Sequence, residues 1–151
     1  RRINKIDLEA FMRKQGILIP DQEQTDERKR ILVVDDDPII TETIVLALEE
    51  DEHDYEVFSA ADGFEAGLQV NHFKPHIVIL DIMMPDIKGY EVCKKIKSNP
   101  DTKNTKIIVL SAYLDEEKFK EMKENGADAC FSKPLPLPQL REEVARFLKL
   151  S

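Results

Sequence analysis

Four short apolar runs stand out along the chain, and each one leads into residues with reactive side chains. Aliphatic and β-branched residues that follow one another without polar alternation are typical of strands buried on both faces of a parallel sheet. The runs and the residues after them are 31–34 before Asp35-Asp36-Asp37, 77–80 before Asp81, 107–110 before Ser111, and 129–132 before Lys133-Pro134. The pattern therefore predicts four strands that carry chemical groups at their carboxyl ends.

Apolar positions with helical spacing fill the intervals between these runs. Ile40, Ile44 and Leu48 form one such stripe, and helices are predicted at residues 38–50, 63–72, 90–98, 116–125 and 137–150. A weaker strand is predicted at residues 55–60. Because strands and helices alternate, we predict an α/β fold: a flavodoxin-like, doubly wound sheet of five parallel strands in the order 2-1-3-4-5, with five helices.

The first 29 residues are expected to lie outside this sheet. Residues 1–19 are predicted to form a short helical segment, with Leu8, Phe11 and Met12 on one face of a helix. Residues 20–29 are predicted to be a polar linker, because no hydrophobic residue lies between Asp21 and Arg30. The main domain then covers residues 30–151. Since the sequence begins with Arg1 instead of Met, we expect it to be a piece of a longer protein.

The composition of the chain predicts its cellular location and excludes some classes of partner. No apolar run is long enough to span a membrane and no signal-peptide pattern is present, so we expect a cytoplasmic protein without a membrane partner. The two cysteines lie inside predicted elements and are expected to be reduced. Residues 1–30 carry eight basic and six acidic side chains, whereas the remainder carries 14 and 24. An acidic main domain disfavours nucleic acid, so any DNA contact requires an N-terminal or a missing domain.

The carboxylates at the strand ends point to a metal site. Asp35, Asp36 and Asp81 would meet at one sheet edge, because the carboxyl ends of neighbouring parallel strands lie together. Two unit charges about 4 Å apart repel by roughly 4 kcal/mol at an effective dielectric near 20. Three hard oxygen ligands without histidine or cysteine suit Mg²⁺. The alternative is that they only solvate the strand ends. Asp37, followed by Pro38, is expected to be a helix N-cap.

A cation beside an aspartate, a hydroxyl and a lysine indicates phosphoryl chemistry. Asp81 can act as a carboxylate nucleophile that forms an acyl phosphate. Lys133 can supply a positive contact, and the Ser111 hydroxyl can donate a hydrogen bond to a phosphoryl oxygen. Taken singly, Ser111 could instead satisfy backbone groups and Lys133 could be a solvated charge. The lysines of predicted helix 90–98, Lys97 among them, are expected on a solvated face.

The motifs resemble the receiver domain of bacterial two-component response regulators over residues 30–150. They are Val33-Val34-Asp35-Asp36-Asp37-Pro38, Leu80-Asp81-Ile82-Met83-Met84-Pro85 with Gly89, Leu110-Ser111-Ala112, and Lys133-Pro134. The resemblance implies a phosphoprotein in which Asp81 accepts a phosphoryl group from a sensor histidine kinase. It also implies that Asp36, Asp81 and the Met83 carbonyl coordinate Mg²⁺ directly, and that Asp35 acts largely through water.

The same resemblance implies the roles of the remaining site residues. Ser111 would be the switch hydroxyl and Lys133 the phosphate contact, with a cis bond before Pro134. Met83 and Tyr113 would tune dephosphorylation. The family usually has an aromatic side chain three residues before the lysine, where this chain has Cys130. Cysteine is too small to report the switch by swinging inward, which leaves the route of the signal open.

The N-terminal residues resemble the tail of an excisionase-like or MerR-like winged-helix DNA-binding domain. The resemblance rests on Arg1-Arg2-Ile3 and on the stretch from Ile6 to Arg13. It implies a transcriptional output domain before the receiver. Alternatively, this stretch is an amphipathic helix that docks on the receiver or pairs with a second copy in a homodimer.

Two further readings of the main domain remain open. Asp35-Asp36-Asp37 also fits a haloacid-dehalogenase-like phosphatase, with Asp35 as nucleophile and Asp37 as acid/base. The cap insertion and the late acidic motif of that family are not found. The other reading is a scaffold that has lost phosphorylation, although every phosphorylation position holds a competent residue. We expect a signalling phosphoacceptor and not an enzyme, with at most self-phosphorylation from small donors and self-dephosphorylation.

Overall fold

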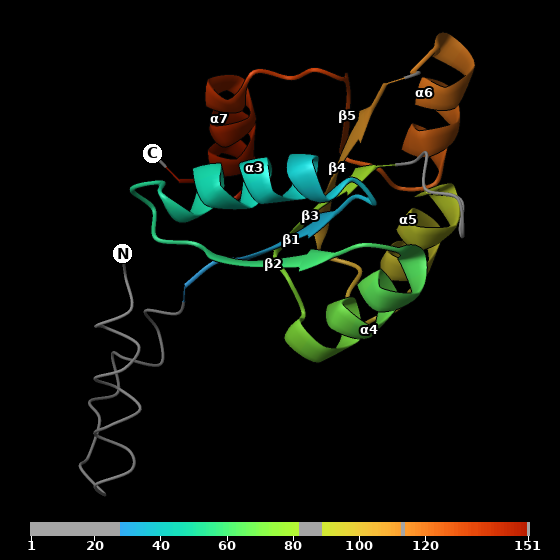
Figure 1. Ribbon diagram of the computed structural model, residues 1–151. Helices are drawn as coiled ribbons and strands as arrows, with labels where there is room; N and C mark the ends of the chain where they lie inside the picture. The colour runs from blue at the N-terminus through green and yellow to red at the C-terminus, as the bar shows by residue number, and fades with distance from the viewer. Residues whose placement is uncertain (1–27, 82–88, 113, 151) are drawn as a thin grey trace, which may run out of the picture.

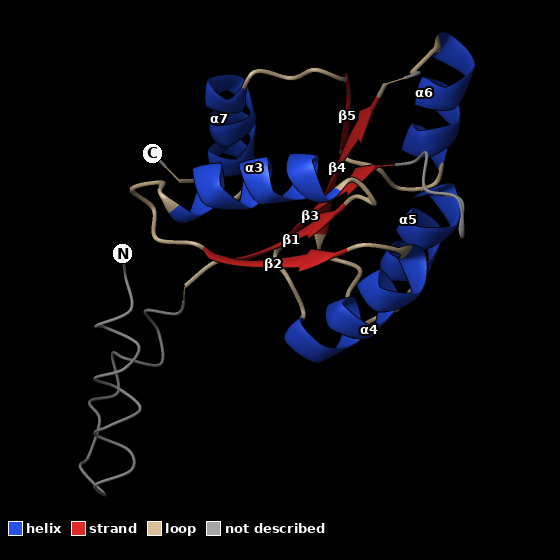
Figure 2. Cartoon of the chain, viewed as in Figure 1, coloured by secondary structure: helices blue, strands red, loops and turns tan. Residues whose placement is uncertain are grey.

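The computed structural model describes residues 28–81, 89–112 and 114–150. Within them, five parallel strands form one sheet in the order β2-β1-β3-β4-β5 (Figures 1 and 2). The strands are β1 (Arg30–Val34), β2 (Glu56–Ala60), β3 (Ile77–Asp81), β4 (Lys106–Ser111) and β5 (Ala129–Ser132). The helices are α3 (Pro38–Glu49), α4 (Gly63–Phe73), α5 (Gly89–Ser98), α6 (Glu116–Glu124) and α7 (Leu137–Phe147). The predicted fold and strand order are confirmed.

Helices cover both faces of the sheet, which explains why the central strands have no polar alternation. Leu32 and Val34 of β1 pack in a cluster with residues of α4, α5 and α6. Ile31 and Val33 pack on the opposite face, in a cluster with residues of α3 and α7. Figure 1 shows the same division, with α3 and α7 on one side of the sheet. Since successive side chains of a strand point to opposite faces, every position of a doubly covered strand is apolar.

Helix caps and turns set the element boundaries. Asp37 is the N-cap of α3 and accepts a hydrogen bond from the Ile39 N–H, as predicted. The last helix ends at Phe147 and not at residue 150, because Lys149 adopts a positive φ of 59° that breaks the helical path. None of the helices in the described ranges is long and apolar enough to cross a membrane. The predicted N-terminal helical segment lies outside the described residues.

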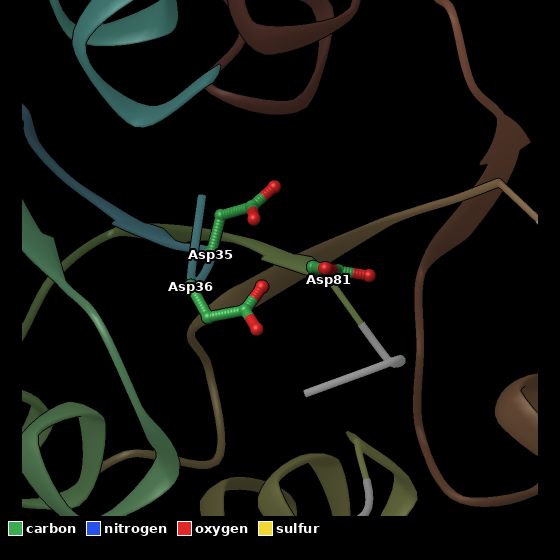
Figure 3. Close-up of side chains that lie close together, drawn as sticks. All are labelled: Asp35, Asp36 and Asp81. Atoms are coloured by element: carbon green, nitrogen blue, oxygen red, sulfur yellow. The ribbon is translucent and has the colours of Figure 1, made fainter. Parts of the chain in front are cut away.

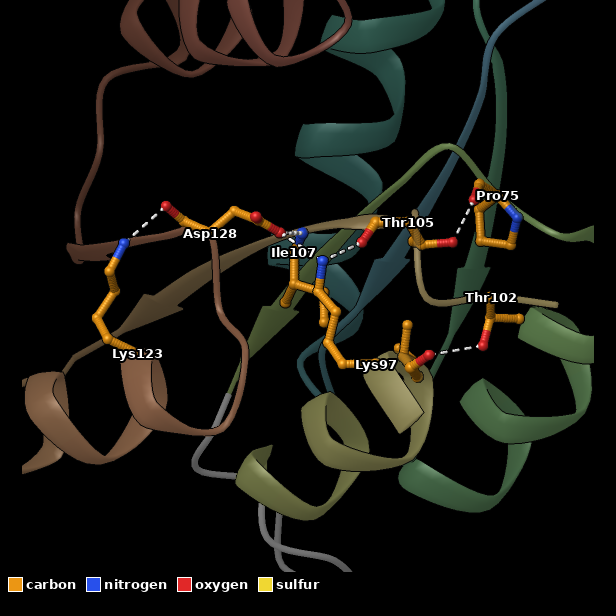
Figure 4. Close-up of polar contacts among 8 residues, drawn as sticks. Pro75, Lys97, Thr102, Thr105, Ile107, Lys123 and Asp128 are labelled. Carbon is orange, nitrogen blue, oxygen red and sulfur yellow. Dashed lines mark hydrogen bonds and ion pairs between the residues drawn. The ribbon is translucent and has the colours of Figure 1, made fainter. Parts of the chain in front are cut away.

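A polar network ties α5 to the amino ends of β4 and β5 (Figure 4). The Lys97 ammonium donates to the Thr105 carbonyl at 2.7 Å and pairs with Asp128 at 3.0 Å. The same Asp128 oxygen accepts the Ile107 N–H at 2.8 Å. The prediction that Lys97 lies on a solvated face was wrong, because helical periodicity does not reveal a carboxylate 31 residues away.

Candidate functional site

Three carboxylates meet at the carboxyl ends of β1 and β3 (Figure 3). Asp35 and Asp36 follow β1, and Asp81 is the last residue of β3. One ligand oxygen from each lies within 4.8 Å of the others. Asp35 and Asp81 are only 4% and 7% exposed, whereas Asp36 is exposed to solvent. The convergence predicted from the strand order is therefore present, with two buried carboxylates and one open to the outside.

Asp35 is held by its neighbours on all sides. Its Oδ1 accepts the Asp37 N–H at 2.9 Å, and its own N–H donates to the Ala60 carbonyl at 3.2 Å. Its carbonyl accepts a hydrogen bond from the Thr41 hydroxyl at 3.2 Å. Thr41 was not predicted, because a threonine one turn into a helix carries no sequence signal of a contact with the preceding loop. These bonds fix the loop that presents Asp35 and Asp36.

Lys133 brings positive charge to the cluster. Its Nζ donates to Asp35 Oδ2 at 2.8 Å and lies 3.7 Å from Asp81 Oδ2, and its side chain is 18% exposed. The Lys133–Pro134 bond is cis, as the resemblance implies. Three carboxylates and one ammonium leave a formal excess of two negative charges. This set of hard oxygen donors with excess negative charge suits a divalent cation.

Ser111 ends β4 at the same edge of the sheet. It is fully buried, and its carbonyl accepts the Lys133 N–H at 2.8 Å. β3 and β4 pair with Asp81 opposite Leu110, so Ser111 lies one residue beyond Asp81 along the edge. The strands thus bring Ser111 and Lys133 together with the acidic cluster, as the sequence predicted.

Cys130 lies further back on β5, where it is half-buried and packs against the cluster that contains Cys93. Both thiols are free in the structure. Burial raises the pKa of Cys130, and it raises the pKa of Cys93 to about 12. Met83 and Tyr113, the predicted tuning residues, lie outside the described residues, as does the Met83 carbonyl.

A hollow of about 400 Å³ opens beside the carboxylates. It is lined by residues of the β1–α3 loop, the first turns of α3, the end of β2 and the start of α4, including Asp35, Asp36, Thr41, Ser59 and Glu65. The exposed carboxylate of Asp36 is therefore accessible from this side. Asp37, in contrast, directs its carboxylate to the first turn of α3 and is not among the three clustered carboxylates.

Comparison with known proteins agrees with this geometry. The family model for the response regulator receiver domain matches residues 31–145. The sporulation initiation phosphotransferase F of Bacillus subtilis (strain 168) is 33% identical over 122 residues, which are 81% of this chain and 95% of that protein. The DNA-binding response regulator MtrA of Mycolicibacterium smegmatis is also 33% identical over 122 residues, but these are only 51% of its length. The chain thus spans nearly all of one relative and about half of the other.

Solved structures show the same fold. The signal receiver domain of a DNA binding response regulator protein (merR) from Colwellia psychrerythraea 34H matches with a TM-score of 0.76 and 29% identity, over 80% of this chain and 98% of that one. A CheY-like response regulator receiver domain from Methanospirillum hungatei JF-1 matches with a TM-score of 0.76 and 30% identity, over 82% and 95%.

Proposed function

Because the chain belongs to the family of response regulator receiver domains, whose members signal through a phosphoryl-accepting aspartate, we propose that Asp81 is the acceptor and that a sensor histidine kinase is the donor. The observation that carries the proposal is the position of Asp81. It is a nearly buried carboxylate at the end of a central strand, clustered with two other carboxylates and 3.7 Å from Lys133.

Mg²⁺ is the cofactor that the carboxylates favour. Asp36 and Asp81 would hold it directly and Asp35 largely through water, with the Met83 carbonyl as a further ligand that the family resemblance implies. When bound, such an ion neutralises negative charge on a transferring phosphoryl group. The fit rests on three hard oxygen donors close together and on the negative charge that Lys133 leaves uncompensated.

Side chains of this protein would each contribute to the phosphoryl transfer. An Asp81 oxygen attacks the phosphorus of a phosphohistidine, an O–P bond forms as the N–P bond breaks, and the imidazole leaves to take up a proton. The Lys133 ammonium compensates charge on the phosphoryl oxygens. Ser111, buried at the neighbouring strand end, would donate its hydroxyl to one of them. Small phosphodonors would serve by the same route, and water would later hydrolyse the acyl phosphate.

The output is proposed to be transcriptional. MtrA, about twice as long as the matched region, is called a DNA-binding response regulator. In this chain the output would lie before the receiver, with residues 1–19 ending a DNA-binding domain, 20–29 forming a linker and 30–151 forming the receiver. Such a protein would act in the cytoplasm, with homodimerisation through the N-terminal segment as the alternative role of residues 1–19.

Labelling with acetyl phosphate and Mg²⁺ tests the acceptor. The wild type and Asp37→Asn should each gain one phosphoryl group by intact mass, and Asp81→Asn should gain none. Asp37→Asn is the matched control, because Asp37 is an adjacent carboxylate that only caps a helix. A phosphatase that used Asp35 and Asp37 would instead turn over phosphomonoesters and lose activity in Asp37→Asn. Equal labelling of wild type and Asp81→Asn would refute the proposal.

Beryllofluoride, which mimics an acyl phosphate, tests whether the site is competent. Its addition with Mg²⁺ should shift the amide resonances of Ser111 and Lys133 in wild type and not in Asp81→Asn. No Mg²⁺-dependent shift in the wild type would favour a scaffold that has lost phosphorylation.

A further inference from the structure

A second charged site lies at the amino ends of the strands, at the edge of the sheet opposite the acidic cluster. A hollow of about 340 Å³ is lined there by five cationic side chains: Lys29, Arg30, Lys74, Lys106 and Lys149. Asp101 is the one carboxylate among the described residues that line it. This basic hollow runs against the composition of the domain, in which residues 31–151 carry 24 acidic and 14 basic side chains.

Two of the five cations are occupied by the end of α4. Arg30 donates to the carbonyls of Phe73 at 2.7 Å and Lys74 at 2.9 Å. The Lys74 ammonium donates to the Asn71 carbonyl at 3.1 Å. The carbonyl ends of helices attract cations, so these two side chains have a structural role.

The other three cations have no such explanation. Within the described part of the chain, the side chains of Lys29, Lys106 and Lys149 make no hydrogen bond or ion pair. Two of them, Lys29 and Lys106, are half-buried, so their charges lie close to the surface of the hollow. The pKa of neighbouring His76 is lowered to about 4, first by burial and then by the charges of Arg30 and Lys29. The second cause shows that the environment is positive. The basic hollow is therefore prepared for an anion.

The chain itself carries a matching anion close in sequence to Lys29 of this hollow. Residues 21–27, here the acidic segment, contain Asp21, Glu23, Asp26 and Glu27 and no basic residue. They precede Arg28, which is anchored at the amino end of the sheet by hydrogen bonds to the Asp54 and Tyr55 carbonyls at 3.1 and 2.8 Å. Because an extended residue spans about 3.5 Å, all four carboxylates can reach the hollow. A short tether gives an effective concentration of roughly millimolar, which favours the segment over free anions.

We propose that the acidic segment docks in the basic hollow through its carboxylates and the ammonium groups of Lys29, Lys106 and Lys149. The contact ties the N-terminal residues to the amino edge of the sheet, away from Asp81. It stands independently of phosphorylation and, being electrostatic and partly exposed, weakens with salt.

Competition with inorganic triphosphate tests the proposal. Three variants are compared with wild type. Asp21→Asn/Glu23→Gln/Asp26→Asn/Glu27→Gln neutralises the segment, and Lys29→Gln/Lys106→Gln/Lys149→Gln neutralises the hollow. Lys94→Gln/Lys95→Gln/Lys120→Gln is the control, on exposed helical lysines that do not line the hollow. Triphosphate should bind the segment variant about tenfold more tightly than wild type, because the tethered competitor is gone. The hollow variant should lose this binding, and the control should match wild type.

Amide resonances provide a second readout that does not depend on the hollow variant being folded. Neutralising the segment should shift the amides of Lys29, Lys106 and Lys149, and added salt should shift them in wild type in the same direction. Equal triphosphate affinity in wild type and segment variant would mean that the hollow takes free anions and not the segment. No binding to the segment variant would mean that it is not an anion site. Either result overturns the proposal.

Discussion

Replacing Lys133 by methionine tests the electrostatics of the acidic cluster. The ammonium lies 2.8 Å from Asp35 and 3.7 Å from Asp81. At an effective dielectric near 20 these contacts correspond to attractions of about 6 and about 4 kcal/mol, before desolvation is subtracted. Breaking a largely buried pair typically costs a net 3–5 kcal/mol, because the partner charge stays behind. We expect Lys133→Met to lose about 3 kcal/mol of unfolding free energy without metal.

Added Mg²⁺ should reverse part of this loss. Without the lysine, the three clustered carboxylates have one positive charge fewer beside them, so a divalent cation gains more by binding. We expect the stabilisation by Mg²⁺ to exceed that of wild type by at least about 1.4 kcal/mol, which is a tenfold gain in affinity. Urea unfolding followed by circular dichroism, once with a chelator and once with excess MgCl₂, measures both quantities.

Lys97→Met is the matched control. Lys97 also pairs with an aspartate, Asp128, at 3.0 Å, and the exposure of its side chain is similar to that of Lys133. It is not paired with any of the three clustered carboxylates. It should be destabilised by roughly 2 kcal/mol in both conditions, with the same Mg²⁺ increment as wild type. If Mg²⁺ stabilised wild type and Lys133→Met equally, the reasoning would be refuted, because the charge of the cluster would then not affect binding of the ion.

Three further substitutions test the fold. Gly126→Ala should lower the free energy of unfolding, measured in urea, by about 2 kcal/mol. Gly126 has φ +109°, and a Cβ there would lie 2.5 Å from Lys97 Cγ. A loss near zero would mean that the turn relaxes freely. Tyr55→Phe should be neutral or stabilising by up to about 1 kcal/mol in the same assay, because the buried Tyr55 hydroxyl has no hydrogen-bond partner among the described residues; a clear loss would reveal one. The lowered pKa of His76 means that, as the pH falls, the unfolded chain binds a proton at this histidine before the folded protein does. The free energy of unfolding should therefore fall from about pH 6.5 towards pH 4, and His76→Asn should flatten that slope. An unchanged slope in the variant would mean that other groups take up the protons.

The sequence was sufficient to predict the edge of the sheet at which the acidic cluster lies. Uninterrupted apolar runs identify doubly covered strands, and the rule that parallel strands present their carboxyl ends together brings Asp35 and Asp81 into one cluster. The rule also brings Lys133 to Asp35 across 98 residues. It works because it depends on strand direction and order, not on the details of any loop.

Contacts between side chains from different layers could not be predicted in this way. Lys97 looked like any exposed helical lysine, yet it pairs with Asp128, because the choice of partner depends on how α5 packs against β4 and β5. The basic hollow has the same origin, since its five cations come from separate segments of the chain. Periodicity assigns a residue to a face but does not identify what lies opposite.

Cys130 gives the last prediction, on how the signal leaves the site. In the family, an aromatic side chain at this position swings inward when the switch hydroxyl moves, whereas a thiol has no bulk to swing. The exposure of Cys130, half-buried on β5, should therefore be set by the backbone and stay constant on activation. We expect its alkylation rate by iodoacetamide to change by less than about threefold, or under 1 kcal/mol, on addition of beryllofluoride and Mg²⁺.

Cys93 is the internal control, because it is fully buried with a pKa of about 12 and should not react in the folded protein. A change of tenfold or more at Cys130, with Cys93 still unreactive, would contradict this reasoning. It would mean that β5 itself moves on activation, and the backbone hydrogen bond from Lys133 to Ser111 would then be the connection that carries the movement.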